Sequence, residues 1–367
     1  MCGWIVNVDV VVIGGGVIGL GVGWRASLAG LSVVVVDDDR PGRGSWAAAG
    51  MLAPLAEAMP GEERLLSLSL RSAAMYPAFV EELESATGIA VGYRPCGSML
   101  VAVDGDDHRW LMELGVLHER MGVVSRRIDR RAARELEPAL DPGIRSALVI
   151  DGDHQVDNRR LLRALRCAAV NVGVQFKSGT AKVVMSRGSA VGVRIGSAGV
   201  ISASRVVVAA GCWSAAVEGV PVEARPAVRP VKGQILRLRC DPAQPVLGRT
   251  VRALVHGANV YLVPRVDGEI VVGGTVEDRG FDSTVTAGAV HELLRDACAV
   301  VPEIAECALV EVHAGFRPGS PDNAPIIGQT AVDGLIVATG HYRNGVLLTP
   351  VTAEIVTAML VTAGAAV

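Results

Sequence analysis

The stretch that decides the fold is DVVVIGGGVIGLGVGWRASLAGLSVVVVD, residues 9–37. An apolar run long enough for a buried strand breaks at three consecutive glycines. A helical pattern follows, and a second apolar run ends in Asp37. Gly14, Gly16 and Gly19 fill the G-x-G-x-x-G spacing. Strand, glycine-rich turn, helix and strand in this order predict a dinucleotide-binding unit of the Rossmann type.

Each residue of this pattern has a physical purpose. Gly14 permits the sharp turn, Gly16 lets a pyrophosphate approach the backbone, and Gly19 lets the helix pack close to the strands. The helix N-terminus then offers free N–H groups and its positive dipole end to the phosphates. Asp37 stands where a ribose-binding carboxylate is expected, which favours FAD or NAD over NADP. The alternative is a glycine-rich turn in an ordinary α/β unit.

Composition limits the classes of protein that remain. The chain has 367 residues, 50% of them hydrophobic, which predicts two domains or one large one. Its net charge of −3 gives no electrostatic reason to expect a nucleic-acid partner. We expect no membrane span and a cytoplasmic protein, because no leader and no unbroken apolar segment is visible. No metal-ligand or C-x-x-C spacing occurs, so we expect no metal and reduced structural thiols at Cys2, Cys96, Cys167, Cys212, Cys240, Cys298 and Cys307.

The chain after residue 37 alternates between helical and strand patterns. The small residues of segment 45–52 indicate either a helix or backbone lying flat against a large planar ligand. Residues 125–137 are expected to form a helix whose arginines face solvent. His154 falls in a polar loop, where a histidine is more often a hydrogen-bonding residue than a catalyst.

The order of elements after residue 158 predicts a return to the first sheet. A helix, several strands and the apolar run at 205–210 follow one another there, and an apolar strand recurs at 335–338. The fold class is therefore α/β, with a discontinuous Rossmann-type nucleotide-binding domain and a second domain of antiparallel sheet and helices. We expect the first domain at 1–58, 155–215 and 330–367, and the second, substrate-binding domain at 59–154 and 216–329.

Several separated motifs resemble one family along nearly the whole chain. They are AAAGML at 47–52, RVVVAAGCWS at 205–214, PVKGQ at 230–234, YLVPR at 261–265, GFRPG at 315–319 and GHYRNG at 340–345. Together with the glycine turn they resemble the FAD-dependent D-amino-acid oxidase family, and within it most resemble the glycine oxidases of thiamine biosynthesis. AAAGML, FRPG and GHYRNG are far more specific than the glycine spacing alone.

The resemblance implies FAD as the cofactor. It implies non-covalent binding, because no cysteine between His313 and Arg343 could anchor the flavin. The small segment would lie beside the flavin, and the backbone of Val183 would hold the adenine. The full set of implied cofactor residues is Gly14, Gly16, Val17, Ile18, Gly19, Asp37, Asp38, Gly44, Ser45, Ala48, Ala49, Gly50, Met51, Val183, Gly211, His341, Tyr342, Arg343, Asn344, Gly345, Val346 and Leu347.

Three residues resemble the family's substrate site. Arg317 corresponds to the arginine that binds the substrate carboxylate, and Arg343 to its companion near flavin and substrate. A planar guanidinium can grip a carboxylate with two hydrogen bonds and stays charged. Tyr261 corresponds to a pocket tyrosine. From the residues alone, either arginine could be a surface residue and Tyr261 a core aromatic.

The resemblance implies an oxidase of small amino acids. Glycine, sarcosine or D-alanine would be oxidatively deaminated with oxygen as acceptor; glycine would give glyoxylate, ammonia and hydrogen peroxide and feed thiazole synthesis. A sarcosine or D-amino-acid oxidase or dehydrogenase of the same family is the alternative. Partners would be the small substrate, oxygen, further copies in a homo-oligomer (a tetramer by analogy) and a thiazole synthase. Val276 and Trp46 depart from the family pattern, and the role of Trp46 is open.

Overall fold

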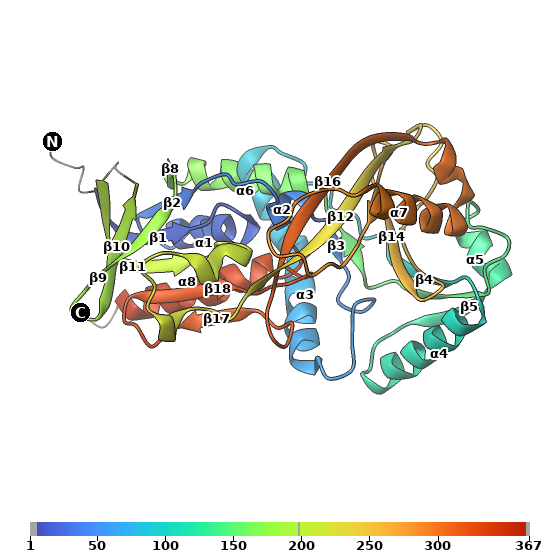
Figure 1. The fold of residues 1–367 in the computed structure, drawn as a ribbon, viewed down its shortest axis with the longest axis horizontal. Coiled ribbons are helices and arrows are strands. Elements are labelled where there is room, and N and C mark those ends of the chain that lie inside the picture. Colours follow the sequence, from blue (N-terminus) through green and yellow to red (C-terminus); the bar gives the residue numbers. More distant parts are fainter. Residues whose placement is uncertain (1–5, 197–198, 365–367) are drawn as a thin grey trace.

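The computed structural model describes residues 6–196 and 199–364. Two sheets lie one after the other along the longest axis (Figure 1). The strands of the first sheet run in the order β17-β18-β11-β1-β2-β8, and β9 and β10 extend it from β11. Their bounds are β1 (Val6–Ile13), β2 (Val33–Asp37), β8 (Gln175–Ser178), β9 (Ala181–Ser186), β10 (Ser189–Ile195), β11 (Gly199–Val208), β17 (Ile326–Gln329) and β18 (Leu335–Thr339).

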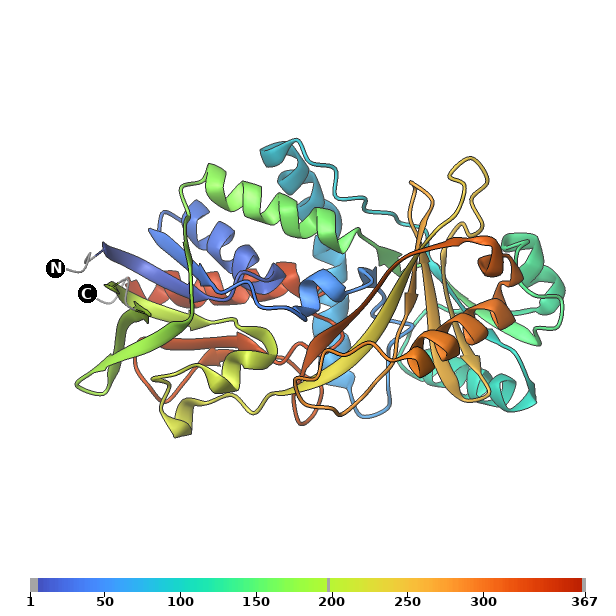
Figure 2. The same cartoon turned by 45° about the horizontal axis from the view of Figure 1, so that its top comes forward.

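Valine runs form the centre of the first sheet because it is covered on both faces. β1, β2, β8, β11 and β18 are parallel, with Val12 opposite Val35 and Val207. Helices α1 (Val17–Leu28), α6 (Asn158–Asn171) and α8 (Thr349–Gly364) cover one face, with α1 between the other two (Figure 2). The β9–β10 hairpin packs against the other face. Parallel strands buried on both faces read as continuous apolar runs, as these do.

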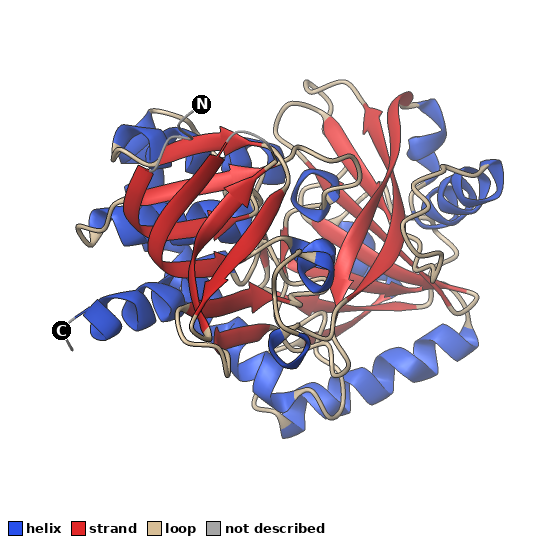
Figure 3. Ribbon diagram, turned by 60° about the vertical axis from the view of Figure 1, so that its left-hand side comes forward, coloured by secondary structure: helices blue, strands red, loops and turns tan. Residues whose placement is uncertain are grey.

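The second sheet is mostly antiparallel and runs in the order β16-β12-β15-β14-β13-β4-β6-β5 (Figure 3). Helix α7 (Ala287–Val300) packs on one face and α4 (Gly105–Arg120) on the other. The long strands β12 and β16 pair along their whole length and reach toward the first sheet. The bounds are β4 (Ser98–Ala102), β5 (Arg126–Asp129), β6 (Ser146–Ile150), β12 (Arg229–Arg239), β13 (Thr250–Val255), β14 (Ala258–Pro264), β15 (Glu269–Gly273) and β16 (Ala308–Gly319).

One long helix lies between the two sheets. Helix α3 (Glu63–Thr87) crosses the molecule between them and contacts α6 and α8. The remaining elements are α2 (Gly44–Ala47), α5 (Arg130–Leu136), β3 (Met51–Leu52), β7 (His154–Gln155), η1 (Gly211–Ala216), η2 (Val222–Ala224) and η3 (Pro302–Glu306). We propose that the two sheets are the cores of the two expected domains; β17 belongs to the first sheet although it precedes the expected boundary at 330.

Two expected elements differ from the structure. Residues 125–137 do not form one helix, because β5 pairs with β6 and the Asp129 side chain accepts from the Ala132 N–H, which starts α5. Residues 199–208 form one strand, where two separate strands were expected. Among the described residues, no helix is long and apolar enough to cross a membrane.

The expectation of reduced thiols throughout was wrong at one pair. Cys240 and Cys307 form a disulfide with their Cα atoms 4.8 Å apart. They follow and precede the antiparallel partners Arg239 and Ala308, so the β12–β16 pairing brings them together across 67 residues of sequence. Cys96, Cys167, Cys212 and Cys298 are free, and Cys2 lies outside the described residues.

The disulfide gives a direct test. Because Cys240 and Cys307 are paired, we expect at most five of the seven cysteines to react in the denatured, unreduced protein and all seven after reduction. Reduction should also lower the free energy of unfolding by about 2–4 kcal/mol, because the cross-link restricts the unfolded chain. Thiol titration and thermal unfolding measure both. Seven reactive thiols before reduction would contradict the pairing.

Candidate active site

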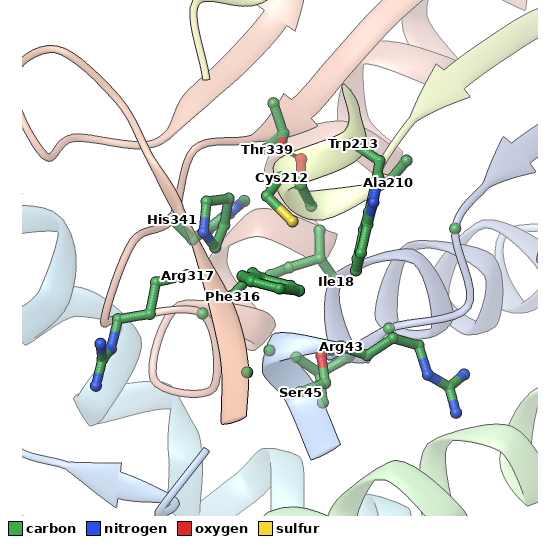
Figure 4. Close-up of a pocket in the computed structure, with 18 of the residues that line it drawn as sticks. Ile18, Arg43, Ser45, Ala210, Cys212, Trp213, Phe316, Arg317, Thr339 and His341 are labelled. Carbon is green, nitrogen blue, oxygen red and sulfur yellow. Dashed lines mark hydrogen bonds between the residues drawn. The ribbon is translucent and has the colours of Figure 1, made fainter. Parts of the chain in front are cut away.

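An elongated cavity lies between the two sheets (Figure 4). Residues from both sheets and from α1, α2 and η1 line it, and Arg43 and Arg317 lie at opposite sides of the view. Most of the predicted site residues meet there: Gly14, Gly16, Val17, Ile18, Asp37, Asp38, Gly44, Ser45, Ala48, Ala49, Gly50, Met51, Gly211, Tyr261, Arg317, His341, Tyr342, Arg343, Gly345 and Val346. Gly19, Val183, Asn344 and Leu347 do not line it.

The glycine turn is packed too closely for side chains. A Cβ on Gly14, whose φ is +114°, would lie 2.4 Å from the Ala209 carbonyl oxygen at the end of β11. A Cβ on Gly19 would lie 1.9 Å from the Gly14 carbonyl oxygen. Gly19 therefore stays outside the cavity but fixes the turn that forms its wall. This packing is the one that the G-x-G-x-x-G spacing predicts.

The N-terminus of α1 opens onto the cavity. Its N-cap, Gly16, has no side chain to cap the first turn. The Ser45 hydroxyl, from α2, accepts from the Val17 N–H at 3.1 Å. The end of α1 and Ser45 thus place N–H and O–H groups at one wall. Free N–H groups and the positive end of the helix dipole suit a phosphate.

Two arginines that the sequence reasoning missed neutralise the acidic residues after β2. The Arg43 guanidinium lies 3.1 Å from Asp37 and 2.5 Å from Asp39. The Arg40 Nε donates to Asp38 at 2.6 Å. Arg40 and Arg43 both line the cavity beside Asp37 and Asp38. Their positions three and six residues after Asp37 in a Gly/Pro loop gave no periodic signal.

The small-residue segment after α2 forms the middle of the cavity wall. Ala47 lies so close to Gly315 that a Cβ added to Gly315 would be 2.2 Å from the Cβ of Ala47. Gly50 has φ +75°, and a Cβ there would lie 1.9 Å from the Val156 carbonyl oxygen. The sequence allowed either a helix or backbone lying along a ligand. The helix ends at Ala47, and the residues that follow it, 48–51, line the cavity.

A buried arginine of the YLVPR motif holds this segment. Arg265 donates to the Ala49 carbonyl at 2.5 Å and to the Gln155 side-chain oxygen at 2.8 Å. Burial lowers the pKa of Arg265 to about 10, so it stays charged at neutral pH. The sequence marked the motif but gave no role for its arginine.

Val183 lies outside the cavity lining, and the assignment of its backbone to the adenine stays a prediction. Its side chain is buried in the core beneath the β9–β10 hairpin. Its N–H donates to the Glu218 carbonyl at 2.8 Å, so this donor is already satisfied. Ala181, the first residue of β9, and Gly179 and Thr180 just before it line the cavity. We propose that these residues lie beside the adenine.

Two glycines of the second sheet leave the space that the Tyr261 and Arg317 side chains occupy. Tyr261 lies over Gly273, where a Cβ would be 2.3 Å from the phenol oxygen. Arg317 lies over Gly233, where a Cβ would be 2.3 Å from the guanidinium. Burial raises the pKa of Tyr261, and the neighbouring positive charge of Arg317 opposes that shift. A neutral phenol and a guanidinium thus meet at the same place in the cavity wall.

The GHYRNG turn closes the cavity from the end of β18. His341 is buried and shares a 3.0 Å hydrogen bond with the Thr352 hydroxyl. Burial lowers the pKa of His341 to about 3, so the ring is neutral. Arg343 is exposed and stacks on the Tyr342 ring at 5.1 Å, at the margin of the cavity. Asn344 and Leu347 are buried behind this turn.

The remaining marked residues lie apart from the cavity. His154 bonds the Asp153 carbonyl and packs edge-on against Tyr93. Trp46 is 42% exposed and stacks with Arg159. Val276 is 62% exposed and does not line the cavity. Glu57 does line it, held by Arg252 at 3.2 Å, and nothing in its sequence context marked it.

These features fit a bound FAD. The uncapped helix end and Ser45 suit the pyrophosphate, Asp37 and Asp38 suit the ribose, and the flat, small-residue wall suits a planar ring. Gly16 leaves its approach open, because its missing Cβ would meet only the Ser45 side chain within 4 Å. The cavity therefore has the features of a dinucleotide-binding site, and Arg317 and Arg343 line it as well.

Comparisons with known proteins agree. The family model described as FAD dependent oxidoreductase matches residues 9–359. The chain belongs to this family, and the predictions of the family and of FAD as its cofactor are confirmed.

Three relatives show which branch is similar. The bifunctional protein ThiO/ThiG of Trichormus variabilis is 35% identical over 96% of this chain and 52% of that protein, so the chain spans about half of its length. The hydrogen cyanide synthase subunit HcnC of Pseudomonas aeruginosa is 32% identical over 94% of this chain and 90% of that protein. The crystal structure of glycine oxidase from Geobacillus kaustophilus superposes with a TM-score of 0.88 and 32% identity, covering 97% of this chain and 95% of that chain.

A pair of glycine variants tests the cofactor wall. We expect Gly19→Ala to lower the stability by about 3 kcal/mol and to abolish retention of FAD, because the new Cβ pushes the glycine turn away from α1. Gly23→Ala on the same helix meets only side-chain methyl groups, the nearest being that of Val35 at 3.2 Å, and should keep its flavin. Flavin absorbance of the purified variants measures retention. A yellow Gly19→Ala protein would contradict the role of the turn.

Proposed function

We propose that this protein catalyses the oxidative deamination of glycine and of small amines such as sarcosine or D-alanine. Oxygen would be the acceptor, and glycine would yield glyoxylate, ammonia and hydrogen peroxide. The similarity to glycine oxidase and to ThiO/ThiG supports this proposal. The proposal depends most on the observation that, within the described residues, the Arg317 guanidinium has no acidic partner.

Arg317 is an unneutralised cation at the cavity wall. Its guanidinium donates to the Thr275 carbonyl at 2.9 Å and approaches the Lys232 carbonyl at 3.4 Å. Within the described part of the chain, no carboxylate lies within ion-pairing distance of it. A partly buried guanidinium without an acid is costly unless a ligand supplies the negative charge. A substrate carboxylate is such a ligand and can accept two parallel hydrogen bonds.

The neighbours of Arg317 suit a small amino acid whose carboxylate is charged and whose amine is neutral when it reacts. Tyr261, kept protonated by burial, can donate to the same carboxylate. His341 is neutral and already bonded to Thr352, so it is a poor proton acceptor. We therefore propose that the amine reacts after binding in its deprotonated form, with no dedicated side-chain base.

Bound FAD would supply the two-electron acceptor for the hydride of the substrate α-carbon. The protein's own contribution is position. Arg317 and Tyr261 would hold the carboxylate, so the α-carbon faces the flat wall formed by Ala48–Met51. The wall segment is in turn held by Arg265. We propose that FAD is bound non-covalently.

We also propose an alternative substrate class and two partners. A sarcosine or D-amino-acid oxidase or dehydrogenase is the alternative, and its distinguishing feature would be the size of the substrate end. The fusion named ThiO/ThiG supports a proposal that the product imine or glyoxylate passes to a thiazole synthase. We also propose a homo-oligomer, by analogy with the family.

Substitution of Arg317 tests the proposed substrate site. We expect Arg317→Ala to raise the KM for glycine about 100-fold, because two charge-assisted hydrogen bonds are lost. Arg317→Lys should recover only part of this, since an ammonium cannot make the planar two-point contact. Steady-state peroxide production measures KM, and flavin absorbance shows that FAD stays bound. An unchanged KM in Arg317→Ala would refute the assignment.

A further inference from the structure

The Arg317 guanidinium donates to two main-chain carbonyls, those of Thr275 and Lys232. Both acceptors belong to a short ladder beside β12, in which residues 275–277 run antiparallel to residues 232–234. The Lys232 and Glu277 main chains exchange two hydrogen bonds of 2.9 Å. The Gln234 N–H donates to the Thr275 hydroxyl at 2.9 Å. The position of the guanidinium therefore depends on the geometry of this ladder.

The Glu277 carboxylate ties the ladder together. One oxygen accepts from the Thr275 hydroxyl at 2.5 Å and from the Gln234 side chain at 2.7 Å. The other faces the Lys232 ammonium at 3.4 Å. Thr275 and Lys232 are the residues whose carbonyls Arg317 contacts. A single carboxylate thus contacts the side chains of both residues that hold Arg317.

The environment of Glu277 keeps it ionised. Burial would raise its pKa, but hydrogen bonds from Thr275 and Gln234 and the charge of Lys232 lower it below the usual value. Lys232 is only 1% exposed, so its ammonium has little access to water. Gln234 also accepts from the Thr286 N–H at 2.9 Å, which connects the group to the start of α7. A buried network with its members satisfied is rigid.

We propose that Glu277 is a positioning residue for the substrate carboxylate: by fixing Thr275 and Lys232 it orients Arg317 toward the cavity. This inference rests on the proposed function of Arg317. Glu277 acts through Arg317 and does not itself touch the substrate. The negative charge of Glu277 by itself would repel a carboxylate ligand. If Glu277 positions Arg317, its removal weakens ligand binding; if only its charge matters, its removal tightens binding.

Acetate binding to the FAD-loaded enzyme separates the two effects. Acetate is a carboxylate that cannot be deaminated, and its dissociation constant is measured from the perturbed flavin spectrum. We expect Glu277→Gln to weaken acetate binding about tenfold and to raise the KM for glycine in parallel, with kcat little changed, because a misplaced guanidinium loses its two-point contact. Unchanged or tighter acetate binding would overturn the proposal.

Two controls complete the design. Glu137→Gln removes a more deeply buried carboxylate, which is paired with Arg249 at 3.0 Å and does not line the cavity; it should lower stability without changing acetate binding. Arg317→Ala should weaken acetate strongly. If it does not, the proposed function of Arg317 fails, and this result is distinguishable from a failure of the Glu277 proposal.

If Glu277→Gln does not fold, Thr275→Val takes its place. This variant removes the hydroxyl from the network and should weaken acetate binding several-fold. Acetate binding equal to that of the wild type would refute the inference.

Discussion

The structure depends on one close approach of backbone to backbone. The turn after β1 lies against the end of β11 and under the start of α1 with no room for a Cβ at Gly14 or Gly19. This packing fixes where α1 points, and the helix end in turn faces Ser45 and the Asp37 carboxylate. The cofactor end of the cavity is therefore a consequence of tight packing in the first sheet, and its polar groups are main-chain donors that need no side-chain rearrangement.

The substrate end follows from a different constraint, the burial of cations beside glycines. Gly233, Gly273 and Gly274 leave space that Tyr261 and Arg317 fill from neighbouring strands. Lys232 is balanced by Glu277 and Arg237 by Glu269, whereas Arg317 and Arg265 have only neutral hydrogen-bond partners within the described residues. The acids nearby pair with other cations, which supports the proposal that Arg317 binds an anionic ligand. Such selective neutralisation is how a site can bind a carboxylate while the fold around it stays stable.

The sequence predicted the local features well and the long-range ones poorly. The valine runs and the G-x-G-x-x-G spacing identified the first sheet because parallel buried strands and their turn have a local signature. Arg317 was predicted only through the FRPG resemblance, since an arginine in a turn has no periodicity. Glu57 and Glu277 were missed because they pair with Arg252 and Lys232, in segments far away in the chain. Arg40 and Arg43 pair with acids two to six residues away and were missed because a Gly/Pro loop has no periodicity. The Cys240–Cys307 disulfide was missed because the two thiols are brought together by the pairing of β12 with β16, which the spacing of the cysteines in the sequence does not show. Val183 lies two residues beyond Ala181, where β9 reaches the cavity, and the role of its backbone toward the adenine stays a prediction.

The measurement that tests the central claim most directly is reduction of the bound flavin by candidate substrates without oxygen. Glycine, sarcosine and D-alanine would each be added anaerobically to the purified yellow protein, and air would then be admitted with a peroxide assay in place. The account predicts that glycine bleaches the flavin at least as fast as the other two and that air restores the colour with formation of peroxide. A flavin that none of the three amines bleaches would contradict it, because the cavity would then serve a different substrate class.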